Sequence, residues 1–183
     1  MFTEVLYSNI QIFYRGVIMG EVYNDAKFKQ VLHYIISNTG HNESADKEIL
    51  YKLLYFSDFN YYELHETMLT GESYRRLDHG PAPSHFKTAV DELIKSGDIE
   101  EFTAKSCGHD RIRYRSLKKP DISLLSADEI KHIDDTLGRY ASMNANQIEA
   151  LSHRDRPWMA SQPDSVLDYE LVFYRPADMS VRF

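Results

Sequence analysis

The stretch that decides the fold is DKEILYKLLYFSDFNYYELHE, residues 46–66. Its apolar residues recur every three or four positions and place one stripe along a helix: Leu50, Leu53, Leu54 and Tyr61. A second stripe lies beside the first on the same helix: Tyr51, Tyr55, Asp58 and Tyr62. A helix with large apolar residues on two adjoining faces is buried on most of its sides. We therefore expect residues 46–66 to form the central helix of the domain.

Two shorter helices flank this one along the chain. Residues 25–39 and residues 84–96 each carry an apolar face at helical spacing, and each pattern ends at a glycine. The segment between the second and third helices, residues 71–83, is polar and is punctuated by Gly80-Pro81. Because proline disfavours the helical conformation in the residue before it, this segment is expected to be extended and to turn sharply at Gly80-Pro81.

A β-hairpin follows the third helix. The runs IEEFTA, residues 99–104, and RIRYRSL, residues 111–117, alternate as two antiparallel strands do. Two capping boxes then open two further helices, one at Ser126-Ala-Asp-Glu129 and one at Asn144-Ala-Asn-Gln147. The last apolar segment, residues 166–175, fits either a helix or a strand.

These patterns predict a mainly α domain of the α+β class. It is a helical domain with a small antiparallel β-hairpin, and its helix–strand–strand order is winged-helix-like. We expect residues 25–175 to form this domain. Residues 1–24 are an N-terminal extension that either docks on the core or precedes a natural start at Met19, and residues 176–183 are a C-terminal tail.

Composition narrows the class of protein and its compartment. The formal net charge of −7 disfavours broad binding to phosphate backbones, which requires a surplus of Lys and Arg. The single cysteine, Cys107, excludes an intrachain disulfide, and together with the lack of a signal peptide it favours a reducing cytosol. Residues 1–20 are apolar, but Glu4 and Arg15 interrupt them, so they are too broken for a membrane span. We expect a cytoplasmic protein with no membrane partner.

Searches for catalytic patterns fail along the whole chain. The eight histidines form no HExxH or H-x3-H pair, and Cys107 has no cysteine neighbour, so no metal site is expected. Ser84-His85 and Asp78-His79 are adjacent pairs whose side chains point in different directions, which is wrong for a nucleophilic relay. The chain also lacks a GxSxG elbow, a Walker loop and a GxGxxG loop. We expect a protein that is not an enzyme and that needs no cofactor.

A nucleic-acid interface is the main alternative from the residues alone. The helix at residues 84–96 and the following hairpin have the order of a recognition helix and wing, and the wing carries Arg111, Arg113, Arg115, Lys118 and Lys119. Against this interpretation, the helix carries Asp91 and Glu92 on its polar side. Helix and hairpin also pack together in domains that bind only proteins, and we favour that interpretation over DNA binding.

The chain resembles the Panacea domain of SocA-like antitoxins. The resemblance rests on KLLYFSDFNYY, residues 52–62, on TGESYRRLDHGPAP, residues 70–83, and on LSHRDRPW, residues 151–158. An LSxxE opening at residues 125–129 and the closing LDYELVFYR fit the same family order. Arg75-Arg76-Leu77 departs from the small residues that members often carry before the GP pair. The motif residues are expected to determine the fold: Leu53, Leu54, Phe56, Gly80, Pro81, His153, Pro157 and Trp158. We expect Trp158 to fill the core.

The resemblance implies an antitoxin that binds a cognate protein toxin and neutralises it by direct contact. It also implies a second mode, in which such a protein is an adaptor that delivers its toxin to a ClpXP-type protease. The family supplies no catalytic residues. We hypothesise that the toxin contacts the second stripe of the central helix and the adjacent polar segment, at Tyr51, Tyr55, Asp58, Tyr62, Arg75 and Arg76, although packing inside the core is the stronger interpretation of that stripe. A homo-oligomer stays open as a further partner.

Overall fold

The computed structural model describes residues 23–39, 45–106 and 109–182. The chain order of its elements is α1 (Asp25–Asn38), β1 (Ala45–Asp46), α2 (Lys47–His65), β2 (Tyr74–Leu77), β3 (Gly80–Pro83), α3 (Phe86–Lys95), β4 (Ile99–Ser106), β5 (His109–Ser116), α4 (Ala127–Tyr140), α5 (Ala145–His153), α6 (Arg156–Ala160) and the 3-10 helix η1 (Tyr169–Tyr174). The described residues therefore form a mainly helical fold with small antiparallel sheets, and the predicted class is confirmed.

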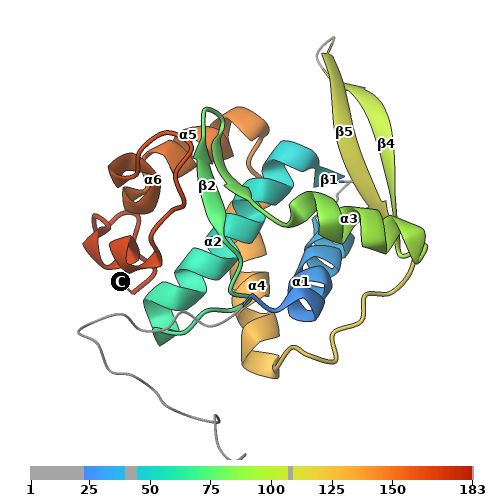
Figure 1. Ribbon diagram of the computed structural model, residues 1–183, viewed down its shortest axis with the longest axis horizontal. Helices are drawn as coiled ribbons and strands as arrows, with labels where there is room; N and C mark the ends of the chain where they lie inside the picture. Colours follow the sequence, from blue (N-terminus) through green and yellow to red (C-terminus); the bar gives the residue numbers. More distant parts are fainter. Residues whose placement is uncertain (1–22, 40–44, 107–108, 183) are drawn as a thin grey trace, which may run out of the picture.

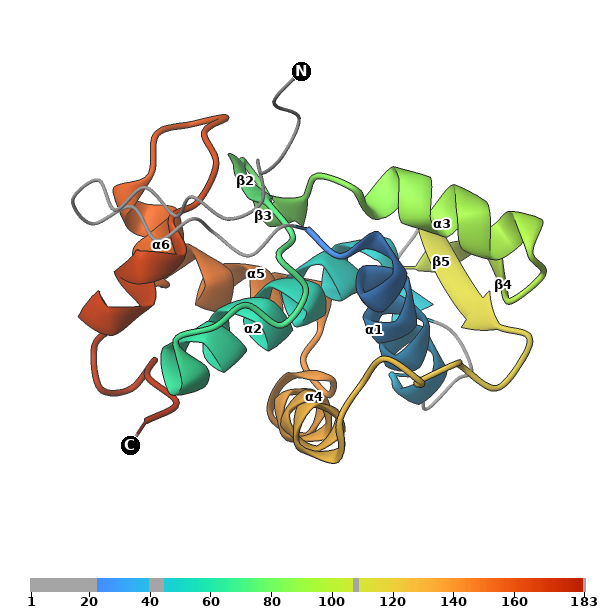
Figure 2. The same cartoon turned by 60° about the horizontal axis from the view of Figure 1, so that its bottom comes forward.

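Helix α2 runs through the middle of the molecule, as its two apolar stripes predict. Helices α1, α4 and α5, strand β3 and η1 all pack against it, and Figures 1 and 2 show it enclosed by these elements. Asp46 caps the helix, because its carboxylate accepts a hydrogen bond of 2.9 Å from the backbone N–H of Glu48. The motif residues Leu53, Leu54 and Phe56 are buried in the core around it.

The first sheet has the strand order β1-β5-β4 and carries the predicted hairpin. Strands β4 and β5 pair antiparallel from Ile99 opposite Ser116 outward. Helix α3 packs on β4 and α1, while the far end of the hairpin projects beyond the helical body in Figure 1. The two-residue strand β1 is an addition that the sequence did not predict. A strand of two residues has no alternating pattern that could be recognised in the sequence. It pairs with β5 because α2, which follows it directly, places it there.

The second sheet is the short hairpin of β2 and β3, in the segment expected to be merely extended. Its turn lies at Asp78 and His79, and Gly80 follows with φ of +102°, a conformation that favours glycine. Residues 164–167 extend this sheet on its other edge. Arg76 donates its backbone N–H to the carbonyl of Ser165, and Leu167 donates to the carbonyl of Tyr74.

Both predicted capping boxes are present, at Ser126 for α4 and at Asn144 for α5. The segment left open as helix or strand is the 3-10 helix η1. Residues 176–182, expected to be a tail, pack against the C-terminal end of α2: the hydroxyl of Ser180 and the backbone N–H of Val181 both donate to the carboxylate of Glu63.

Candidate functional site

The predicted contact stripe on α2 lies mostly inside the molecule. Tyr55, Asp58 and Tyr62 are 0%, 1% and 6% exposed, while Tyr51 is half-buried and meets the ring of Phe86 edge-on. The expectation of a partner-facing stripe is therefore corrected for Tyr55, Asp58 and Tyr62, which are buried in this structure. The physical reason is the central position of α2, since elements on every side cover its second stripe.

Asp58 is the polar centre of an aromatic core. Its carboxyl group accepts a hydrogen bond of 3.1 Å from the backbone N–H of Thr70, one from the Thr70 hydroxyl, and one of 2.6 Å from the hydroxyl of Tyr74. Burial raises the pKa of Asp58 to about 7, although the hydrogen bonds from Tyr74 and Thr70 oppose the shift. The group ties α2 to the loop before β2, and it offers no reacting atom to solvent.

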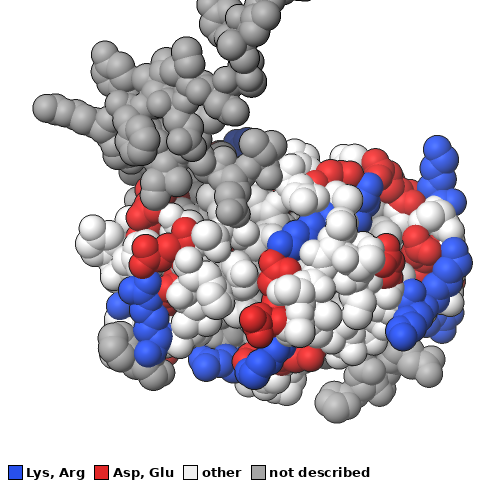
Figure 3. All heavy atoms as spheres, turned by 90° about the horizontal axis from the view of Figure 1, so that it is seen from below, with Lys and Arg blue, Asp and Glu red and all other residues white. Residues whose placement is uncertain are grey.

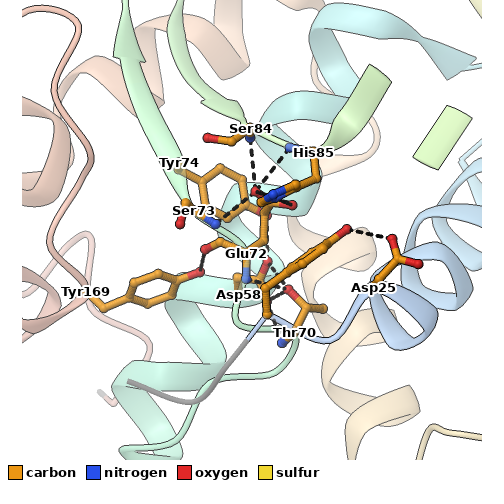
Figure 4. A network of polar contacts seen from close by, with 10 residues as sticks. Asp25, Asp58, Thr70, Glu72, Ser73, Tyr74, Ser84, His85 and Tyr169 are labelled. Carbon is orange, nitrogen blue, oxygen red and sulfur yellow. Dashed lines mark hydrogen bonds and ion pairs between the residues drawn. The ribbon is translucent and has the colours of Figure 1, made fainter. Parts of the chain in front are cut away.

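Glu72 and His85 form a second polar cluster, drawn in Figure 4. The Glu72 carboxylate accepts hydrogen bonds from the backbone N–H groups of Ser73 and Ser84, and its Oε1 lies 3.0 Å from Nδ1 of His85. Burial raises the pKa of Glu72, while His85 lowers it. The ring of Tyr23 stacks on the ring of His85 at 4.0 Å between centroids. A carboxylate–imidazole pair can serve a hydrolase, but no hydroxyl or thiol nucleophile contacts this imidazole among the described residues, so the cluster joins the start of α3 to β2.

A third cluster is a buried ion-pair network. Arg175 donates to both oxygens of Asp155, at 2.8 and 2.5 Å, and to Oε2 of Glu63 at 2.7 Å. The hydroxyl of Tyr55 adds a hydrogen bond of 2.9 Å to Asp155. All three charged side chains are at most 2% exposed. The network locks the end of η1 to α2 and to the start of α6.

None of these clusters was predicted from the sequence. The partners of the Glu72 carboxylate lie within 13 positions of it, but in the ion-pair network 112 positions separate Arg175 from Glu63. No local spacing predicts such a pairing. The one usable signal was the presence of charged residues inside otherwise apolar segments, since a buried charge requires a partner.

Three motif segments meet around Gly80. A Cβ atom placed on this glycine would lie 2.7 Å from the hydroxyl oxygen of Ser152 and 3.0 Å from Cε of Lys52, so only glycine lets β3 pack this closely on α2 and α5. The side chain of Lys52 is 2% exposed, and its Nζ is 3.5 Å from Glu48. Burial lowers the pKa of Lys52, and Glu48 opposes the shift. The segments 52–62, 70–83 and 151–158, which are separate in the chain, therefore pack against one another.

Trp158 lies at the rim of this packing and not in the core. Its ring stacks on His153 with centroids 4.1 Å apart, and Cζ of Arg76 lies 4.1 Å from its ring centroid. Its indole N–H donates to the carbonyl of Leu77 at 3.3 Å. Trp158 is half-buried, so the expectation that it fills the core is wrong; the neighbouring Pro157 is the buried residue. We call Arg76, Leu77, His153 and Trp158 the Trp158 surface.

The basic hairpin carries less free charge than its sequence indicates. Arg111 lies 3.6 Å from Asp46, Arg115 donates its Nε–H to Glu100 at 2.6 Å, and Lys118 lies 3.1 Å from Asp98. Arg113 is half-buried and Lys119 is exposed. On the face that Figure 3 draws, basic and acidic side chains are intermixed, and several basic ones gather at its right edge beside acidic ones. Phosphate backbones bind to unneutralised basic surface, and these ion pairs reduce it here.

The described ranges are residues 23–39, 45–106 and 109–182. Within these ranges no group of three or more His, Cys, Asp and Glu side chains is arranged to hold a metal ion. None of the helices described in these ranges is long and apolar enough to cross a membrane. Cys107 lies outside the described residues.

Comparison with known proteins gives one match. The model of the family described as antitoxin SocA-like, Panacea domain, matches residues 50–159, which include most of α2, the β2–β3 hairpin, α5 and Trp158. None of the curated proteins and none of the solved structures matches the chain. The matched segment spans more than half of the sequence and holds all three motif segments that converge at Gly80. The chain therefore belongs to the SocA-like antitoxin family and carries its Panacea domain.

Proposed function

We propose that this protein neutralises a cognate protein toxin by binding it directly in the cytosol. The observation that carries the proposal is the family match over residues 50–159, which gives the chain an antitoxin-like role. The single cysteine supports the cytosol as the compartment. An antitoxin must hold its toxin tightly, so the interface should reach the standard size of about 1,600 Å² in total, with a few aromatic or arginine anchors.

The clusters of buried groups support binding over catalysis. Asp58 is enclosed by the donors that bind it, and Arg175 by its two carboxylates, so each of these groups already has its partners inside the fold. Of the six residues that the sequence offered as toxin contacts, Arg75 is exposed, while Arg76 and Tyr51 are half-buried. These three residues remain the proposed contacts from that set.

The test uses the protein encoded by the neighbouring reading frame as the toxin. Induction of that protein alone should stop bacterial growth, and co-expression of this chain should restore it. Purified together, the two proteins should form a complex that elutes as one species. Growth arrest that persists when this chain is present, together with no complex, would refute the proposal.

Neutralisation can work by occlusion or by delivery to a protease of the ClpXP type. A pulse-chase measurement of toxin lifetime separates the two modes. If the chain is an adaptor, the toxin becomes short-lived only when both the chain and the protease are present, and a strain without the protease loses the rescue. If the chain occludes the toxin, rescue is the same in both strains. Light scattering on the purified chain and on the complex measures whether either contains two copies of the chain.

DNA binding by the hairpin is the alternative function. Its test is a mobility-shift titration on the DNA upstream of the gene. Arg113→Ala and Lys118→Ala should weaken binding and flatten its salt dependence if the hairpin contacts phosphates. The ion pairs of Arg111, Arg115 and Lys118 lead us to expect no specific shift.

A further inference from the structure

The Trp158 surface brings an aromatic ring and an arginine side chain together at a place where both are accessible. Arg76 and Trp158 are half-buried, and Leu77 beside them is 40% exposed. Arg75 precedes Arg76 in β2 and is exposed. Tryptophan and arginine are the residue types most enriched among the side chains that dominate protein–protein binding energy. The surface therefore has the composition of a contact site.

The charge of this surface is positive, although the protein as a whole is acidic. Arg75 donates to the carbonyl of Asp164, and Arg76 donates to the carbonyl of Ser161. Neither guanidinium forms an ion pair with a carboxylate of the described residues. Both arginines are thus held in place by neutral acceptors, and their charge stays available to an incoming anion.

His153 gives a second sign of a local positive field. Burial lowers the pKa of its ring, while Glu149 opposes the shift. Three neighbouring cationic groups lower it further: Lys52, His79 and Arg76. The side chain of His79 is 79% exposed at the turn of the β2–β3 hairpin. A partner that approaches Trp158 therefore meets the positive charge of Arg76 on β2.

His153 also contains a polar atom that the fold leaves without a hydrogen bond. Its Nε2 is buried, and it has no partner among the described residues. The ring is nevertheless held in place by its stacking on Trp158. A buried polar atom without a partner opposes folding, and such atoms are tolerated chiefly where a site has a task other than stability.

The surface is rigid before any partner arrives. Gly80 fixes the β2–β3 hairpin against Ser152 and Lys52, and the indole N–H of Trp158 binds the carbonyl of Leu77. The hairpin is also tied to residues 164–167 by backbone hydrogen bonds. A contact site that is already ordered loses little conformational entropy on binding, so more of its interaction energy becomes affinity.

We propose that Arg75, Arg76 and Trp158 form the toxin-contacting surface, and that this surface takes an acidic segment of the toxin. The inference rests on the proposed function and adds to it the place of contact and the chemistry of the partner. One carboxylate of the segment pairs with Arg76 beside Trp158, and a second pairs with Arg75, whose side chain leaves β2 on the opposite face of the strand. An apolar side chain of the segment packs on Leu77 and on the edge of the Trp158 ring, since Arg76 and His153 cover the two faces of that ring. The planar guanidinium suits a carboxylate because it donates two parallel hydrogen bonds.

A nucleic acid fits this surface less well than an acidic peptide does. The patch is small, and Asp78 and Glu149 stand beside it. At physiological salt the field of a charge fades over about 8 Å, so a short acidic segment feels mainly the arginines. A long polyanion would extend past them over the surface of a chain whose net charge is −7.

The experiment compares two charge reversals in the full chain. The test variant is Arg75→Glu with Arg76→Glu, and the control is Arg139→Glu with Lys131→Glu, which makes the same charge change on the exposed side of α4. Thermal unfolding of both variants verifies that they fold. Binding to the neighbouring-frame protein is measured by calorimetry at 50 and 300 mM salt, and growth rescue is measured in parallel.

The test variant should bind at least ~30-fold more weakly than the wild type, lose growth rescue and bind no more weakly at 300 mM than at 50 mM salt, because two charge-assisted contacts become repulsive and salt screens the repulsion. The control should bind and rescue as the wild type does. Equal binding by the test variant and the wild type would overturn this inference and leave the proposed function standing, whereas failure of the wild type to bind or rescue would overturn both. Loss of binding to upstream DNA, with toxin binding intact, would assign the surface to a nucleic acid and overturn the inference as well.

Discussion

At the scale of single residues, Asp58 is a buried carboxyl group that accepts hydrogen bonds inside an aromatic core. The rings of Tyr55, Phe59 and Tyr74 pack around one another beside it, with centroid distances between 4.3 and 5.7 Å. Asp58 supplies the acceptor that the hydroxyl of Tyr74 needs once it is removed from water. The carboxyl group is therefore part of the packing of the core.

The titration of Asp58 predicts a pH-dependent stability. Its pKa is about 7 in the folded chain and near its usual value of 3.8 in the unfolded chain. The folded state thus binds the proton more strongly, so this contribution to stability is complete below pH 4 and is lost as the pH rises through 7. At 1.36 kcal/mol per unit, the contribution is on the order of 4 kcal/mol.

Asp58→Asn removes this titration and keeps the shape. All other groups titrate equally in both proteins. The free energy of unfolding of the wild type should therefore fall relative to that of the variant as the pH rises from 5 to 8. Urea unfolding at a series of pH values measures the difference. Parallel curves for the two proteins would show that Asp58 does not titrate in this range.

Substitution of Gly80 gives a second prediction at the residue scale. Gly80→Ala should destabilise the fold by about 1–3 kcal/mol, because φ of +102° strains an alanine and because Cβ meets Ser152. The matched control is Gly138→Ala in α4, where a Cβ has no atom within 4 Å. That change should stabilise the protein by about 0.5–1 kcal/mol, since alanine favours a helix interior. Chemical denaturation of both variants tests the pair, and two shifts of the same sign would contradict it.

At the scale of elements, the ion-pair network of Arg175 holds three of them together. Burial alone would lower the pKa of Arg175, but Asp155 and Glu63 raise it above its usual value, so the charge is retained in the interior. Arg175→Met should destabilise the protein by about 3–5 kcal/mol, because two buried carboxylates lose their cation. The control is Arg154→Ala, which removes the exposed ion pair with Asp178 and should cost at most ~1 kcal/mol. If the two variants lost equally in melting temperature, the buried network of Arg175 would not be what holds these elements together.

The elements also show how far sequence reasoning reaches. The central helix, the β4–β5 hairpin and the two capping boxes were predictable, because periodicity and caps are local signals. Strand β1 and the β2–β3 hairpin were not, since their pairing depends on what α2 and residues 164–167 place beside them. The same limit explains the site. Arg75 and Arg76 were candidates from their place in a motif, but the contact of Arg76 with Trp158 joins positions 82 apart and has no local signal.

At the scale of the whole molecule, residues far apart in the chain supply each other's hydrogen-bond partners. Glu63 on α2 receives hydrogen bonds from Arg175, Ser180 and Val181, and its carbonyl accepts one from Arg182. The region that matches the family model ends at residue 159, before these partners. The matched region therefore depends on residues outside it for the charge balance of its central helix.

A truncation tests this dependence. A chain that ends at Tyr174 should lose its cooperative unfolding transition, because a loss of about 3–5 kcal/mol or more is a large part of a typical stability of 5–15 kcal/mol. A chain that ends at Ser180 keeps Arg175 and should still unfold cooperatively. Calorimetry on the two chains gives the comparison, and a full transition in the shorter one would show that Glu63 and Asp155 find other partners.

The partners of Glu63 are synthesised long after Glu63 itself. The ribosome makes α2 early, and 112 positions separate Glu63 from Arg175, the cation of its carboxylate. At about 5–20 residues per second, translation of that interval takes roughly 6 to 22 s. Arg182, which donates to the backbone carbonyl of Glu63, is made later still. The interior around Glu63 is therefore complete only after residues 175–182 have been translated.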